Sequence, residues 1–76
     1  MHRVTLYTRN GCHLCDEALV VLLRYGLSPR LVDIDTDPAL RKCYNDCVPV
    51  VEIDGKERFR GRVNEVLLAR LLATEG

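Results

Sequence analysis

The chain has 76 residues, enough for one small domain spanning residues 1–76. Hydrophobic residues make up 47% of the sequence, which excludes intrinsic disorder because disordered segments are poor in such residues. Eleven basic residues balance eleven acidic ones, so the chain lacks the basic excess that binds nucleic acid. No apolar run approaches the ~18 residues of a membrane span, and no secretion signal opens the chain. We therefore expect a monomeric cytoplasmic protein with neither a nucleic-acid nor a membrane partner.

The first third of the sequence predicts a strand followed by a helix. Residues 3–8 alternate apolar and polar side chains, the pattern of a half-buried strand. A helix begins at Cys12 or His13 and ends before Gly26, because acidic residues occupy its first turn and glycine is favoured just past a helix end. The apolar residues at helical spacing, which we expect to be buried, are Leu14, Ala18, Val21, Leu22 and Tyr25. The aliphatic run over residues 20–23 predicts burial on more than one side of this helix.

The remaining two thirds of the sequence predict three strands and two helices. The strands cover residues 31–34, 48–53 and 56–60, and the first of the helices covers residues 38–44. Asp54-Gly55 is a strong signal for a hairpin turn between the last two strands. Asn64 can cap the final helix, whose expected buried residues are Leu67, Leu68, Leu71 and Leu72. The order strand, helix, strand, helix, strand, strand, helix predicts one α/β domain with a mixed four-stranded sheet and helices on both faces.

Cys12 and Cys15 form a C-x-x-C pair where the first strand passes into the first helix. A pair in this place within a βαβ unit is typical of thioredoxin-like redox motifs. The free backbone N–H groups at a helix start favour a thiolate at Cys12, whereas Cys15 lies one turn further in and is more covered. We predict that Cys12 attacks a disulfide and that Cys15 resolves the resulting mixed disulfide. Arg9 and His13 flank the pair and either contact an anion or remain solvated surface residues.

Cys43 and Cys47 leave three interpretations open. In the first, neither has a role, and Cys43 is a small buried hydrophobic residue. In the second, they form an auxiliary dithiol, or Cys47 shares the disulfide of the first pair. In the third, Cys12, Cys15 and Cys47 bind zinc together with Cys43 or His13. The first interpretation is our expectation, with no metal bound.

Three segments of the chain resemble glutaredoxin-like proteins of the thioredoxin superfamily, and the small C-H-L-C members most of all. They cover residues 6–15, 48–55 and 59–65, and the similarity extends along nearly the whole chain. The resemblance implies strand order 2-1-3-4 and a cis peptide bond between Val48 and Pro49. It also implies that the Val48 backbone pairs with the main chain of a substrate. The substrate-binding residues that we predict are Arg9, His13, Val48, Pro49 and Asn64.

The resemblance and the cysteine pair together predict a thiol–disulfide oxidoreductase acting on disulfide-containing proteins or low-molecular-weight thiols. No cofactor is expected, and glutathione is the candidate co-substrate. The chain departs from the family pattern at Arg62 and at Asp46, which places a negative charge where the glycyl carboxylate of glutathione would take a positive one. The alternatives are a non-catalytic module that binds metal or senses redox state through its thiols, and a binding domain in which the cysteines are incidental.

Overall fold

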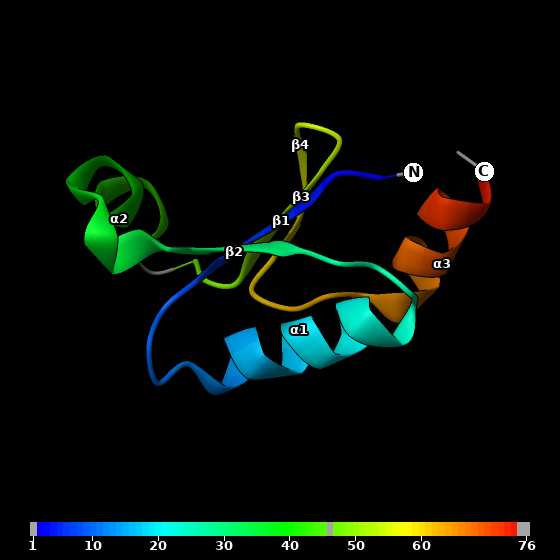
Figure 1. Cartoon of the computed structure of the whole chain (residues 1–76), viewed down its shortest axis with the longest axis horizontal. Coiled ribbons are helices and arrows are strands. Elements are labelled where there is room, and N and C mark those ends of the chain that lie inside the picture. Colours follow the sequence, from blue (N-terminus) through cyan, green and yellow to red (C-terminus); the bar gives the residue numbers. More distant parts are fainter. Residues whose placement is uncertain (1, 46, 75–76) are drawn as a thin grey trace.

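The computed structural model describes residues 2–45 and 47–74, which form a four-stranded sheet with three α-helices (Figure 1). The strands are β1 (Val4–Thr8), β2 (Arg30–Asp33), β3 (Val50–Ile53) and β4 (Lys56–Arg60). The helices are α1 (His13–Arg24), the 3-10 helix η1 (Ile34–Thr36), α2 (Pro38–Tyr44) and α3 (Glu65–Thr74). The strand order is β2-β1-β3-β4, with β1 parallel to β2 and β3 antiparallel to both of its neighbours. This confirms the predicted fold.

Local signals set several of the element boundaries. The sulfur of Cys12 caps α1 by accepting a hydrogen bond from the Cys15 N–H at 3.1 Å. Gly26 follows the end of α1 with a φ of 77°, in the left-handed region that favours glycine at helix ends. Asp54 and Gly55 have φ values of 54° and 84°, as a two-residue hairpin turn requires. These features depend on neighbouring residues only, which explains why the sequence predicts them.

Three strands differ from their predicted bounds: β1 and β3 are shorter by one and two residues, and β2 lies one residue earlier. β2 ends at Asp33, because the Asp33 carboxylate accepts a hydrogen bond from the Asp35 N–H at 2.9 Å and thereby begins η1. The sequence did not predict η1. β3 begins at Val50 because Pro49 has no N–H to contribute to the sheet ladder.

The hydrophobic core lies between one face of the sheet and the helices α1 and α3, which Figure 1 shows on the same side of the sheet. It consists of Val4, Leu6, Ala18, Leu22, Val51, Ile53, Phe59, Val63 and Leu68. Tyr7 follows Leu6 in β1 and therefore points to the opposite face of the sheet. There its ring lies 5.0 Å from the ring of Tyr44, at the end of α2. Helices thus cover both faces.

The helices bury less of their apolar surface than predicted. In α1, Leu14 is 38% exposed, and Val20 and Leu23 are each 54% exposed, so the predictions that Leu14 is buried and that α1 is buried on more than one side are wrong. The reason is that α1 packs on the sheet through a single face, which carries Leu22. Leu67 in α3 is also exposed, contrary to prediction, because α3 faces the core through Leu68. No helix in the described part of the chain is long and apolar enough to cross a membrane.

Candidate active site

Cys12 occupies the position directly before α1, with its side chain partly exposed. Its backbone N–H donates a hydrogen bond to the Arg9 carbonyl at 3.2 Å. Its sulfur accepts a hydrogen bond from the backbone N–H of Cys15 at 3.1 Å. This N–H is one of those at the helix start that have no partner within the helix. A sulfur that is partly exposed in this position is reachable by a substrate.

Cys15 has a different environment from Cys12. Its side chain is buried, with 2% exposure, in the first turn of α1. Burial raises the pKa of the Cys15 thiol, and hydrogen bonding with the Cys12 side chain raises it further. Hydrogen bonding to the Thr8 side chain and to the Arg9 backbone opposes this shift by lowering the pKa. The pair therefore combines one accessible sulfur with one that is covered and held as a thiol, and both cysteines are free thiols in this structure.

Arg9 is engaged within the protein. Its Nε and Nη2 donate to the two carboxylate oxygens of Asp35, each at 2.9 Å. Its Nη1 donates to the Asn45 carbonyl at 3.2 Å, and its Nη2 also donates to Asn45 Oδ1 at 2.7 Å. The guanidinium thus links the turn before Cys12 to η1 and to the end of α2. A contact of Arg9 with substrate remains a prediction.

The peptide bond between Val48 and Pro49 is cis, as the resemblance implied. Pro49 is buried, and its carbonyl accepts a hydrogen bond from the Gly61 N–H at 2.7 Å. Within residues 2–45 and 47–74, no hydrogen bond engages the backbone of Val48. With no partner for its N–H or C=O among the described residues, Val48 suits pairing with an extended substrate, and that pairing remains a prediction.

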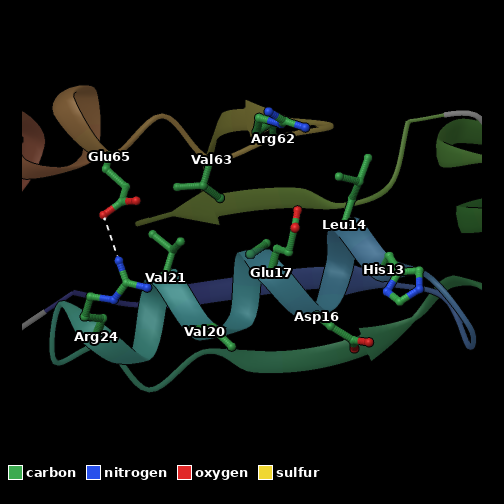
Figure 2. Close-up of a pocket in the computed structure, with 11 residues that line it drawn as sticks. His13, Leu14, Asp16, Glu17, Val20, Val21, Arg24, Arg62, Val63 and Glu65 are labelled. Carbon is green, nitrogen blue, oxygen red and sulfur yellow. Dashed lines mark hydrogen bonds and ion pairs between the residues drawn. The ribbon is translucent and has the colours of Figure 1, made fainter.

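A groove of about 460 Å³ runs along α1 from the two residues between the cysteines. Leu14, Glu17 and Val21 point from α1 to the side on which Val63 lies, in the segment that follows β4 (Figure 2). His13 is exposed and lies at the end of the groove next to Cys12. The sequence does not reveal this groove, because its two walls are far apart along the chain. The one local signal is Leu14, an apolar residue inside the C-x-x-C pair.

Charged side chains line this groove at one end and on the wall opposite α1. At the end away from the cysteines, Arg24 and Glu65 form an ion pair at 3.3 Å, and Figure 2 shows it joining α1 to the start of α3. Arg62 is exposed on the wall opposite α1. Asp46, the other departure from the family pattern, lies outside the described residues.

Asn64 acts as the cap of α3, as predicted. Its Oδ1 accepts hydrogen bonds from the N–H groups of Val66 and Leu67 at 3.0 and 3.2 Å. The structure therefore gives the side chain of Asn64 a local task, and its contact with substrate remains a prediction.

This arrangement predicts the effect of replacing Asn64. Asn64→Ala should lower the free energy of unfolding by about 1 kcal/mol, because two N–H groups of α3 lose their acceptor. Asn64→Asp keeps the acceptor and should remain close to wild type. Urea denaturation of the three proteins measures both effects, and an equal loss in the two variants would contradict the capping role.

Cys43 and Cys47 differ from the first pair of cysteines in their exposure and in their partners. Cys43 is exposed on α2, so the prediction that it is buried is wrong. The reason is that α2 buries none of its residues. Cys47 is partly buried, and its sulfur accepts a hydrogen bond from Arg60 Nη1 at 3.5 Å. Among the residues that the structure describes, no three His, Cys, Asp or Glu side chains gather in a way that could hold a metal ion.

Solved structures that are similar to this one include the following three. Two of them are more than 25% identical to this chain in sequence, and the third shows a likeness in fold alone. The target protein XcR50 from X. campestris is 32% identical, with a TM-score of 0.80 over 93% of this chain and 96% of that one. A glutaredoxin (grx-1) from Archaeoglobus fulgidus is 26% identical, with a TM-score of 0.67 over 95% of this chain and 87% of that one. Fasciola hepatica thioredoxin, at 20% identity and a TM-score of 0.60, covers 99% of this chain and 81% of its own.

The comparison with family models agrees with these structures. No curated protein matches the chain. The model of the glutaredoxin-like domain (DUF836) matches residues 3–73, which include both cysteine pairs and all four strands. The chain therefore belongs to the glutaredoxin-like domain family and has the fold of the thioredoxin superfamily.

Proposed function

We propose that the protein is a thiol–disulfide oxidoreductase that reduces disulfides of proteins or small molecules through Cys12 and Cys15. The observation that carries this proposal is the unequal environment of the two sulfurs at the start of α1. Cys12 is accessible and receives a helix N–H, whereas Cys15 is buried and its pKa is raised by that burial. An enzyme of this kind needs one thiol that reacts with substrates and one that reacts only within the molecule.

The reaction consists of two exchanges at these sulfurs. The Cys12 thiolate attacks one sulfur of the substrate disulfide, that S–S bond breaks, and the departing sulfur takes up a proton. The Cys15 thiol then gives up its proton and attacks the Cys12 sulfur, which forms the Cys12–Cys15 disulfide and releases the second substrate thiol. Two electrons pass from the protein to the substrate, and a thiol reductant must return them.

The partners follow from this chemistry. The substrates are disulfide-containing proteins or low-molecular-weight disulfides, positioned by the Val48 backbone and by the groove that starts at His13. The candidate reductant is glutathione, of which two molecules would supply the two electrons and leave as glutathione disulfide. The setting is the cytoplasm, where thiol reductants keep such a pair reduced.

A trapping experiment tests the assignment of the two cysteines. Cys43→Ser and Cys47→Ser are combined with Cys15→Ser, and the protein is mixed with glutathione disulfide. We expect a stable mixed disulfide at Cys12, one glutathione per chain, because the resolving thiol is missing. The same background with Cys15 intact should instead yield the Cys12–Cys15 disulfide, as peptide mapping by mass spectrometry would show.

The trapping experiment and an analysis of metal content together separate the proposal from the alternatives. A module that only senses or binds through its thiols would form the adduct at the rate of an ordinary free cysteine. A metal-binding module would carry stoichiometric metal after purification without a chelator. An adduct that forms faster on Cys15 in a Cys12→Ser variant than on Cys12 in the Cys15→Ser variant would reverse the two roles.

A further inference from the structure

The Arg9 guanidinium joins three segments that are distant in the sequence. It pairs with both carboxylate oxygens of Asp35 in η1 and with the carbonyl and Oδ1 of Asn45 at the end of α2. Figure 1 shows α2 and the turn before α1 at the same end of the molecule. Two parallel N–H···O bonds between a guanidinium and a carboxylate fix orientation as well as distance. Arg9 is therefore held in one geometry relative to η1.

Asp35 is itself held in place. Its backbone N–H donates to the Asp33 carboxylate at 2.9 Å, and the Thr36 hydroxyl donates to the Asp33 carbonyl at 2.7 Å. Hydrogen bonding from Arg9 lowers the pKa of Asp35, and the charges of Arg9 and Arg41 add to this effect, so the carboxylate stays ionised at neutral pH. The ion pair with Asp35 therefore ties Arg9 to a turn that is itself held by hydrogen bonds.

The backbone of Arg9 contacts both cysteines of the proposed active site. Its carbonyl accepts the Cys12 N–H at 3.2 Å, and its backbone also hydrogen-bonds the buried thiol of Cys15. Thr8 adds a second bond to that thiol. Any displacement of Arg9 thus changes how the two sulfurs lie relative to each other.

We propose that Asp35 is a positioning residue for the dithiol: through its ion pair with Arg9, it holds the Arg9 backbone against Cys12 and Cys15 and keeps the two sulfurs aligned for resolution. The part of this proposal that concerns the resolving step rests on the proposed function. The part that concerns the packing around Cys15 does not. Loss of the pair has opposite effects on two reactions of the same thiol. Attack of Cys15 on Cys12 becomes slower because alignment is lost, and reaction of Cys15 with an outside reagent becomes faster because its cover loosens. A change in acidity alone would move both rates in the same direction.

The test compares Asp35→Asn with Asp54→Asn. Asp54 also accepts hydrogen bonds, from the Arg3 N–H and from His2, but it lies in the hairpin turn between β3 and β4. With Cys43 and Cys47 replaced by serine, an aromatic disulfide releases one coloured thiolate on attack by Cys12 and a second on resolution by Cys15. In a Cys12→Ser background, the alkylation rate of Cys15 by iodoacetamide is measured separately. Circular dichroism establishes that each variant is folded at the assay temperature.

We expect Asp35→Asn to slow the second phase about fivefold and to speed alkylation of Cys15 about fivefold, because an exposed but networked ion pair is worth a factor of about this size. Asp54→Asn should change neither rate. Arg9→Met combined with Asp35→Asn should slow the second phase no more than either change alone, because the two residues act as one unit.

Three results would overturn the inference: an unchanged second phase in folded Asp35→Asn, equal effects of Asp35→Asn and Asp54→Asn, or additive effects of Arg9→Met and Asp35→Asn. If the protein with Asp35 intact releases only one thiolate, the proposed function fails. The alkylation rates then decide whether Asp35 holds the cover of Cys15, since that readout needs no catalysis.

Discussion

Replacing Cys12 with serine is expected to lower the rate of disulfide reduction by on the order of a thousandfold or more, to the level of the uncatalysed exchange with the reductant. A serine hydroxyl does not ionise at neutral pH, so no nucleophile remains at the accessible position. Serine is also a favoured residue at helix N-caps, so α1 should still begin at residue 13. The measurement is steady-state reduction of an insulin-type or aromatic disulfide with dithiothreitol as reductant.

Cys43→Ser is the matched control for this loss. Cys43 is the exposed cysteine of α2, and the substitution changes the same atom without touching the start of α1. We expect it to keep the rate of the unmodified protein within about twofold, since surface substitutions have small effects. Comparable losses in Cys12→Ser and Cys43→Ser would show that the two cysteines act together, as in the zinc interpretation with Cys43 as the fourth ligand.

Replacing Leu22 with alanine is expected to lower the free energy of unfolding by about 2–5 kcal/mol, because it leaves a cavity in the core. Leu22 is fully buried against the sheet. Leu23, the next residue in α1, is more than half exposed. Leu23→Ala removes the same atoms and should change the stability by no more than about 0.5 kcal/mol.

Urea denaturation of the two variants measures this difference directly. Since a small domain has a total stability of about 5–15 kcal/mol, Leu22→Ala should be partly unfolded at elevated temperature while Leu23→Ala is not. Similar losses in both would mean that α1 is buried on two sides, as the run of aliphatic residues over 20–23 first predicted.

The comparison of these two leucines shows where sequence patterns fail. Both lie in an aliphatic run, and a run without polar breaks does not define which face of a helix is buried. The exposure of Leu14 and Leu67 has the same origin. A small sheet covers only one side of each helix, and the angle at which the helix lies on that sheet decides which side it is.

What the sequence determined by itself is local. The order of the elements, the turn at Asp54-Gly55, the cap at Asn64 and the placement of Cys12 at a helix start all depend on interactions within about four residues. The C-x-x-C spacing is local too, and it predicted that the second cysteine is more covered than the first. The structure agrees, with Cys12 partly exposed and Cys15 buried.

What only the tertiary structure decided is which distant groups meet. Arg9 finds Asp35 and Asn45, which are 26 and 36 residues away, and so joins the turn at the cysteines to η1 and α2. Val63 closes the groove along α1 from across the domain. No local pattern predicts these contacts, because a guanidinium satisfies its donors equally well with solvent, a ligand or any nearby carboxylate. The packing of strands and helices selects the partner.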